Sequence, residues 1–447
     1  MQLKRVLDLR TIVATSAGLT LSVSTFVAAV QVAGYVLGDS AWIAILTGGV
    51  LCLLAAACFS ELNGLLPTAN GIRLYFSRAF NDQVALVVSL MYMTVVIIGV
   101  IGAESFILAQ VLRDVFPSFP PYLWVLLLIL TVTAMNIRGV RIAGVFQQIV
   151  TYGLLASLIL FSLFALQKVN FQLEMPFVPG SAEGLINAIA LGIFLYVGFE
   201  WVTPLAEEVT DVKNISKGMM IAIGILSVTY SVFTVAMTSL VPKELLVDSA
   251  APHMIFAREV LGAPGAAWMV LISLAATVTT FNAGLISVSR FMYASAREQV
   301  LPAVFAKVSL RYFTPWTAIL ALSGLATVVA AATMISGRYL VLVEMAAAIE
   351  AIVFMLAGLA VISLRRRAPD QPRPYLIKGN LLVPVLTVIV FALLAAAVLA
   401  ESLLALIILT AVLAASIIYV KTAIPYLKRK HAERKQQQPR RRRVSSE

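Results

Sequence analysis

The chain has 447 residues, of which 61% are hydrophobic and only 12% are charged. A soluble domain carries about 25% charged residues, so this composition excludes an ordinary soluble protein and indicates one that is dissolved in lipid. The net charge of +11 does not indicate nucleic-acid binding, because the densest basic run lies in the polar segment from Lys428 to Glu447, which has no tyrosine, tryptophan or phenylalanine.

Twelve apolar runs follow one another along the chain, and a membrane-crossing helix needs about 20 such residues. Polar, proline-rich or charged segments separate the runs. We therefore predict an all-α polytopic membrane protein, with a twelve-helix domain over residues 1–425 and a basic, disordered tail over residues 426–447. Helices 1–5 span about 11–167, helices 6–10 about 185–363 and helices 11–12 about 382–424. The runs are 11–36, 41–66, 84–112, 121–137, 144–167, 185–206, 217–241, 264–293, 315–335, 338–363, 382–400 and 402–424.

Lysine and arginine are divided unevenly between the two sides of such a bundle. With the N-terminus inside, 28 of the 33 basic residues fall on the inner side, as the positive-inside rule requires. A helix count that was wrong by one would destroy this asymmetry. We therefore predict a multi-pass protein of the plasma membrane with both termini in the cytoplasm. The five outer residues are Arg113, Lys168, Lys243, Arg258 and Arg338.

The first run groups small and hydroxyl-bearing residues near the middle of the membrane. An interrupted helix there leaves backbone N–H and C=O groups that face a cavity and can bind a ligand's carboxylate. Small residues also allow helices to pack closely, so the sequence leaves both interpretations open. The candidate substrate-binding residues of this run are Gly18, Ser22, Val23, Ser24 and Thr25.

The second run holds both cysteines, and the third run holds an acid. Cys52 and Cys58 are six residues apart, on different faces of a helix, and we expect them to be buried small residues. His253 and His431 are isolated, so no metal site and no cofactor is predicted. Glu104 is a candidate coupling residue, because an acid within the membrane costs about 2.5–3.5 kcal/mol and usually faces a cavity or a partner. A position near the outer mouth is the alternative.

The sixth run also has the features of an interrupted helix. Gly198 suits the end of one half-helix, and Pro204 suits the first turn of the next. Glu200 lies between them, and its role is left open between proton carrier, contact for a substrate amine and buried acid bracing the helix. Because runs one and six are counterparts in a five-plus-five inverted repeat, we predict a break in both.

Other acids lie near the inner surface or in the tenth run. We expect Glu61, Glu207 and Glu208 to act as intracellular gate or loop-bracing residues. Glu344 and Glu350 are six residues apart and do not share a helix face, so at least one is expected to be structural. The predicted partners of the inner acids are Arg73, Arg290 and Arg297.

Two further motifs are more specific. Residues 289–302 follow the pattern S-R-x-x-Y-A-x-A-R-x-x-x-L-P, and the second run ends in an E-L-x-x-x-x-P pattern that begins at Glu61 and is followed by Gly71. On these motifs the chain resembles the amino acid–polyamine–organocation superfamily of transporters over about its first ten helices. It departs from that family's first-helix pattern G-x-x-x-G-x-G-I-F, because Ser22 and Ser24 replace two glycines.

The resemblance implies the leucine-transporter fold and alternating access. It implies that the substrate's carboxylate lies against the unwound backbone of helix 1, and that Phe194 is an aromatic gate over the substrate. The backbone expected to bind the carboxylate is that of Ser22, Ser24 and Thr25. The carbonyl groups expected to accept hydrogen bonds from the amino group lie near Phe194, Tyr196 and Val197.

The coupling ion is less clearly indicated. Some proton-coupled members of the superfamily carry a lysine in helix 5, but residues 147–155 contain none, so that device is missing or replaced. Side chains in helix 8 offer oxygens for a possible sodium site, although hydroxyls in membrane helices more often bond to their own backbone. The possible cation-site residues are Thr279, Thr280 and Asn282.

Other function classes fit the sequence poorly. A membrane-embedded enzyme needs a catalytic set at membrane depth, a channel needs a pore loop or charged rings, and an ATP-driven pump needs a phosphate-binding motif. We predict secondary active transport of amino acids by proton-coupled symport or exchange, with a polyamine or other organic amine as the alternative substrate. The expected partners are the small-molecule substrate and membrane lipid; an accessory subunit and the oligomeric state are left open.

Overall fold

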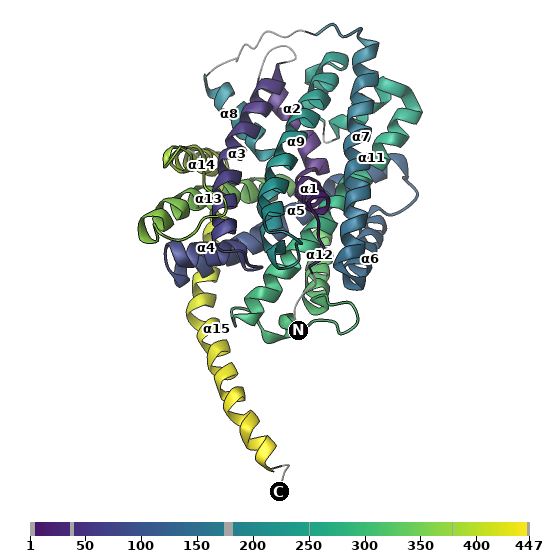
Figure 1. The fold of residues 1–447 in the computed structure, drawn as a ribbon. Helices are drawn as coiled ribbons and strands as arrows, with labels where there is room; N and C mark the ends of the chain where they lie inside the picture. The colour runs from purple at the N-terminus through teal and green to yellow at the C-terminus, as the bar shows by residue number, and fades with distance from the viewer. Residues whose placement is uncertain (1–4, 36–39, 174–181, 250, 378, 445–447) are drawn as a thin grey trace.

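The computed structural model describes residues 5–35, 40–173, 182–249, 251–377 and 379–444, with the side chains of 96–98, 114, 182, 183, 186, 401 and 430–444 left out. This part of the chain is a bundle of helices (Figure 1). Outside the helices of this part of the chain, one isolated β-bridge pairs Leu7 with Val209. Both ends of the chain lie on the lower side of the view in Figure 1.

Eleven helices of the described chain are long and apolar enough to cross a membrane, and the bent pair α1 and α2 makes a twelfth span. The predicted all-α architecture with twelve spans is confirmed. The first five spans are α1 (Leu9–Thr20) with α2 (Val23–Gly34), α3 (Ala41–Leu65), α5 (Asp82–Val115), α6 (Pro121–Arg138) and α7 (Val140–Lys168). The next five are α8 (Ala182–Phe194) with η1 (Phe199–Glu207), α9 (Lys213–Leu240), α11 (Pro252–Arg297), α12 (Trp316–Ser336) and α13 (Tyr339–Arg367). The last two are α14 (Leu382–Glu401) and α15 (Leu403–Val444).

Three short helices connect the spans: α4 (Gly71–Ala79), α10 (Lys243–Val247) and η2 (Ala303–Ala306). The sequence predicts a proline-rich break between residues 242 and 264, but α10 and the first turns of α11 are helical there. Within α11, Gly262 has a left-handed φ of 66° and Pro264 follows it. A glycine of this kind ends a helix and a proline suits the first turn of the next, so the chain bends here.

The first span is interrupted where the small hydroxyl residues lie, as the sequence predicts. α1 ends at Thr20, α2 begins at Val23, and their axes differ by 61°. Ser22 has an extended backbone, and the Thr25 hydroxyl accepts from its N–H at 3.3 Å and donates to its carbonyl at 2.6 Å. These side-chain bonds satisfy backbone groups that a continuous helix would have paired, which makes the break tolerable away from water.

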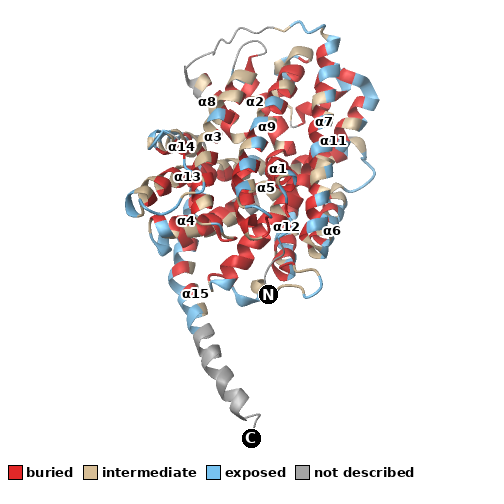
Figure 2. Cartoon of the chain, viewed as in Figure 1, coloured by how far each residue is buried: buried red, intermediate tan, exposed pale blue. Residues whose placement is uncertain are grey.

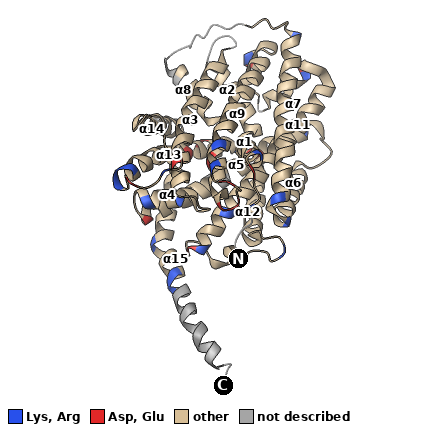
Figure 3. Ribbon diagram, viewed as in Figure 1, with Lys and Arg blue, Asp and Glu red and all other residues tan. Residues whose placement is uncertain are grey.

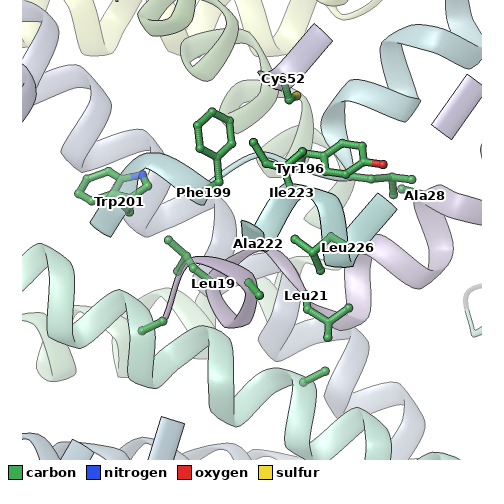
Figure 4. Packing of buried hydrophobic residues seen from close by; sticks show 14 of the residues in the cluster. Leu19, Leu21, Ala28, Cys52, Tyr196, Phe199, Trp201, Ala222, Ile223 and Leu226 are labelled. Carbon is green, nitrogen blue, oxygen red and sulfur yellow. The ribbon is translucent and has the colours of Figure 1, made fainter. Parts of the chain in front are cut away.

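The sixth span is interrupted as well, and its break touches the first. α8 ends at Phe194, and Gly198 adopts a left-handed φ of 104°, which other residues rarely adopt. A Cβ atom on Gly198 would lie 3.3 Å from the Leu19 side chain, and the Ser16 hydroxyl donates to the Phe199 carbonyl at 2.9 Å. Figure 4 shows Leu19 and Leu21 of the first interruption in the same buried apolar cluster as Tyr196 and Phe199 of the second.

The last two spans are the least buried of the continuous spans in the described chain, although α6 is little more buried than they are, at 33%. In the most apolar part of the sixth span 72% of the residues are buried, compared with 28% in α14 and 22% in α15. Figure 2 shows buried residues concentrated in the bundle and exposed residues along α15. Figure 3 shows that lysine and arginine lie mainly in the lower half of the view, on the side of the N-terminus. The last two spans therefore present most of their apolar surface to lipid.

The last helix differs from the sequence prediction beyond residue 425. α15 continues as a helix to Val444, whereas the sequence predicts a disordered tail over residues 426–447. Lysine, arginine, glutamine and glutamate are good helix formers. Because the preceding span is already helical, the helix only has to be extended and no new first turn has to be nucleated. The side chains beyond Arg429 lie outside the described residues.

A close glycine contact between α3 and α8 offers a test of this packing. A Cβ atom on Gly48 would lie 2.4 Å from the carbonyl carbon of Gly192, which is backbone and cannot rotate away. We expect Gly48→Ala to force the helices apart and to cost about 1–3 kcal/mol, seen as a lower thermal unfolding midpoint in detergent. Gly153→Ala is the control, since its added methyl meets nothing within 4 Å. Equal midpoints for the two variants would contradict the packing described.

Candidate functional site

Two neighbouring cavities lie beside the interrupted helices. The smaller, of about 40 Å³, lies at the break of the first span, and the larger, of about 170 Å³, extends from it toward Tyr35 at the end of α2. Because four residues line both cavities, the two meet at the break itself. The shared lining residues are Ser24, Phe194, Val197 and Val343.

The structure brings most of the predicted helix 1 residues to this place. Ser22, Ser24 and Thr25 line the smaller cavity, and Val23 is buried beside them. Gly18 is different, because it lies inside α1 and lines neither cavity. A Cβ atom there would lie 2.0 Å from the Gln147 amide nitrogen, so Gly18 allows α1 to pack closely on α7, and its binding role stays a prediction.

Of the predicted helix 6 residues, Phe194 and Val197 line both cavities. The side chain of Tyr196 is fully buried and points elsewhere, since its hydroxyl donates to the Ile45 carbonyl of α3 at 2.9 Å. Its main chain remains at the break. Within the described part of the chain, no turn or loop hydrogen bond ends on the carbonyls of residues 195–197, and of these three residues only Val197 lines the cavities.

Glu104 lies at the break rather than near the outer mouth. Its two carboxylate oxygens accept from the backbone N–H groups of Val23 at 2.9 Å and Ser24 at 3.1 Å. Only 1% of the residue is exposed. The first N–H groups of a helix carry partial positive charge and favour an anion, so this carboxylate acts as the N-terminal cap of α2.

Glu200 belongs to a buried cluster with Tyr92 of α5 and Glu350 of α13. The Tyr92 hydroxyl donates to Glu200 Oε1 and lies 3.0 Å from Glu350 Oε2. Trp201 stacks on the Tyr92 ring at a centroid distance of 4.6 Å. The second carboxyl oxygens, Glu200 Oε2 and Glu350 Oε1, have no hydrogen-bond partner in the described chain.

The number of protons available for these contacts limits the charge that the cluster can carry. The phenol has one proton and can donate to only one carboxyl group at a time. The other contact has a donor only if one of the two carboxyl groups carries a proton. No ion pair of the described residues includes either of them. Two ionised carboxylates without a cation would be costly in a dry interior, which agrees with a shared proton.

The possible cation-site residues of α11 do not converge on one point. Thr279 donates to the Ala276 carbonyl of its own helix, and Thr280 donates to the Gly18 carbonyl at 3.2 Å. Asn282 donates to Gln147 Oε1 at 2.7 Å and accepts from Asn136 at 2.7 Å. Gln147 also donates to the Ala14 carbonyl of α1, so a neutral amide of α7 fills this junction.

Ion pairs close the side of the bundle that carries the N-terminus. Glu208 pairs with Arg290 at 2.7 Å and Glu207 pairs with Arg297 at 3.0 Å, as the sequence predicts. Glu61 is different, because its partners are not among the predicted arginines. It binds Arg365 at 2.5 Å and Arg373 at 3.1 Å, which ties α3 to the end of α13 and the loop after it. The predicted partner Arg73 binds Glu298 instead.

Sequence reasoning missed the contacts of two participants in the buried cluster, Tyr92 and Glu350. Tyr92 gave no signal, since tyrosines are common in membrane helices. Glu350 was recognisable as an acid in an apolar run, but its distance from Glu200 in sequence hid their contact. Glu344, the other acid of this stretch of α13, lines the larger cavity, where its Oε2 has no partner in the described chain.

The family and the proteins that this chain resembles are named as permeases or transporters. The model of a family described as amino acid permease matches residues 7–426. Large neutral amino acids transporter small subunit 2 of Oryctolagus cuniculus is 29% identical over 372 residues, 77% of this chain and 66% of that protein. Asc-type amino acid transporter 1 of Homo sapiens is 28% identical over 369 residues, which are 78% of this chain and 68% of that protein. The methylthioribose transporter of Bacillus subtilis (strain 168) is 25% identical over 395 residues, which are 83% of this chain and 82% of that protein.

The match to the first of these relatives is partial. The chain spans just under two thirds of the length of the Oryctolagus cuniculus protein and most of the length of the Bacillus subtilis one. The matched family and these three relatives are named for transport rather than for catalysis.

The ion pair between Arg290 and Glu208 can be tested against an exposed counterpart. Both side chains are almost completely buried, so Arg290→Met leaves an unpaired buried carboxylate. We expect a loss of about 3–5 kcal/mol in stability, measured as a lower unfolding midpoint and folded yield. Much of the loss should return in the double variant with Glu208→Gln.

Arg297→Met is the matched control. Its pair with Glu207 is half-exposed, so the expected loss is at most about 1 kcal/mol. If Arg290→Met and Arg297→Met lowered the unfolding midpoint equally, the conclusion that the buried ion pair is more important for stability than the exposed one would be wrong.

Proposed function

Because the chain belongs to the amino acid permease family, we propose that it carries amino acids or closely related amines across a membrane by alternating access. The observation that carries this proposal is the contact between the two interrupted helices. Interrupted spans are tolerated where their free backbone faces a protected cavity, and both breaks line the same one here. A cavity of this kind at the middle of the bundle is where a secondary transporter binds its substrate.

The substrate class has two candidates. Two of the relatives are named for amino acids and one for methylthioribose, so the names favour amino acids without excluding other small solutes. An organic amine is the second candidate. The observation that favours it is the position of Glu104, whose carboxylate occupies the N–H groups expected to bind the carboxylate of an amino acid.

The direction of access follows from the ion pairs. The pairs of Glu61, Glu207 and Glu208 close the side of the N-terminus, while the larger cavity extends toward Tyr35, which is 38% exposed at the other end of α2. We infer a state that is closed toward the cytoplasm. In the opposite state these ion pairs would separate and the cavity would open on the inner side.

The coupling proposal rests on the buried acids. A glutamate pair that shares a proton and has no basic partner in the described chain can release that proton when the cluster becomes hydrated. Proton-coupled symport or exchange is therefore proposed. Sodium coupling has less support, because Thr280 and Asn282 already use their polar groups in hydrogen bonds to α1, α6 and α7.

Location and assembly are proposals as well. The excess of lysine and arginine on one side supports a plasma-membrane protein whose two termini lie in the cytoplasm. The Oryctolagus cuniculus relative is named as a small subunit, so an accessory subunit is an open proposal for this chain.

Uptake into proteoliposomes tests the function and the coupling together. We expect the full chain to accumulate labelled substrate, found by screening amino acids and amines, faster under an imposed proton gradient and no faster under a sodium gradient. Glu200→Gln should keep insertion and abolish gradient-driven accumulation, because an amide cannot release the proton. Glu259→Gln is the control, since that acid lies exposed on α11.

The outcomes separate the two parts of the proposal. Uptake by Glu200→Gln that matched the native protein over roughly pH 5 to 8 would refute the coupling role of Glu200. Absence of uptake of every amino acid and amine would refute the transport function.

A further inference from the structure

Glu344 of α13 is the one acid among the described residues that line the larger cavity. The residues of α13 in this lining recur every three or four positions, so one face of the helix is turned toward the cavity. Its neighbour Val343 on that face lines both cavities, so the acid lies close to the break of the first span. A substrate that occupies both cavities therefore meets Glu344.

The carboxylate of Glu344 lacks the donors that Glu104 and Glu208 have. Its Oε2 is buried without a hydrogen-bond partner in the described chain, and none of the ion pairs there includes it. Glu104, in contrast, accepts from two backbone N–H groups, and Glu208 pairs with Arg290. A buried carboxylate oxygen without a donor is costly, so a donor group of a ligand would supply what this acid lacks.

The charges around the two cavities favour a cation. Lysine, arginine and histidine are absent from the residues described as lining either of them. Glu104 adds a second negative charge behind Ser24, which lines both cavities. An amino acid with a neutral side chain has no net charge and leaves both acids uncompensated. One with a cationic side chain brings a net positive charge to a place where little water screens it.

The rest of the larger cavity suits the stem of such a side chain. Its wall is mostly apolar and includes Val27, Ala28 and Ile107. The side chains of lysine, ornithine and arginine have an apolar stem of methylene groups that ends in a cation. A substrate of this kind buries its stem against the wall and places its charge beside the one acid. Leucine would also bury hydrocarbon here, but it would leave Glu344 without a donor.

We propose that the substrate is an amino acid whose side chain ends in an ammonium or guanidinium group, and that Glu344 selects it. The carboxylate of Glu344 accepts a charge-assisted hydrogen bond from that group, while the α-amino and α-carboxylate groups stay at the break. This inference rests on the proposed transport function and narrows its first candidate class. It separates the chain from the Oryctolagus cuniculus relative, which is named for large neutral amino acids.

Pairs of amino acids that differ by one cationic group test the inference on the native protein. Lysine is compared with norleucine, and ornithine with norvaline, in thermal-shift binding and in uptake by proteoliposomes that contain the full chain. Norleucine and norvaline keep the stem and lack the ammonium group, so they report the apolar contribution alone. We expect each cationic amino acid to bind about 10- to 100-fold more tightly than its partner, the range that a charge-assisted hydrogen bond supports.

Variants of Glu344 then assign the preference to this residue. Glu344→Gln removes the charge and keeps the size, so lysine affinity should fall by about 10- to 100-fold while norleucine affinity changes little. Glu344→Asp keeps the charge but withdraws it by one methylene group, so it should keep the preference for cations and favour lysine over the shorter ornithine. Glu259→Gln changes an exposed acid of α11 and is the control, which should leave the preference unchanged.

The outcomes are distinct. Norleucine and norvaline that bound and entered as well as lysine and ornithine would overturn the inference and leave the transport function standing. A lysine preference that survived in Glu344→Gln would overturn the role of Glu344. Tighter binding of cadaverine, which is lysine without its carboxylate, than of lysine would overturn the assignment to an amino acid. Failure of every amino acid and amine to bind or enter would overturn the transport function, and this inference with it.

Discussion

The structure depends on one constraint: within a membrane, every backbone N–H and C=O group needs a partner supplied by the protein itself. In the described chain, two spans are interrupted near their middle, and the others meet this need as continuous helices apart from the bend at Gly262 of α11. At the first break Thr25 and Glu104 replace the lost helical bonds, and at the second Gly198 turns the chain while the Phe199 carbonyl receives the Ser16 hydroxyl. The two interrupted spans contact each other where the Ser16 hydroxyl of the first donates to the Phe199 carbonyl of the second, and residues of both breaks line the cavities.

The buried acids differ in role, and the neighbours of each acid determine that role. Glu104 is stabilised as an anion by two N–H groups at a helix N-terminus. Glu200 and Glu350 have only a phenol between them, so they need a proton. Glu208 has a buried arginine. One residue type therefore serves as a cap, as a proton-sharing pair and as part of a closed inner side, according to which donors the fold brings to it.

The sequence predicted much of this fold and part of the site. Hydropathy and the placement of lysine and arginine predicted twelve spans, because lipid imposes a length and a composition on each helix. Gly198 and the hydroxyl residues near Ser22 located the breaks. The contacts between distant helices could not be predicted, since nothing local to Tyr92 or Glu350 indicates that they meet Glu200, and nothing local to Glu104 indicates that it reaches Val23. The partners of Glu61 were wrong for the same reason.

The central claim is that the two breaks face a water-accessible cavity at the middle of the bundle. It is tested most directly by Ser24→Cys in a background where the buried Cys52 and Cys58 are replaced by alanine. A water-soluble thiol reagent applied to proteoliposomes should modify this cysteine, and a bound substrate should protect it. A cysteine at this position that reacts only with a lipid-soluble reagent, and that substrate does not protect, would contradict the account.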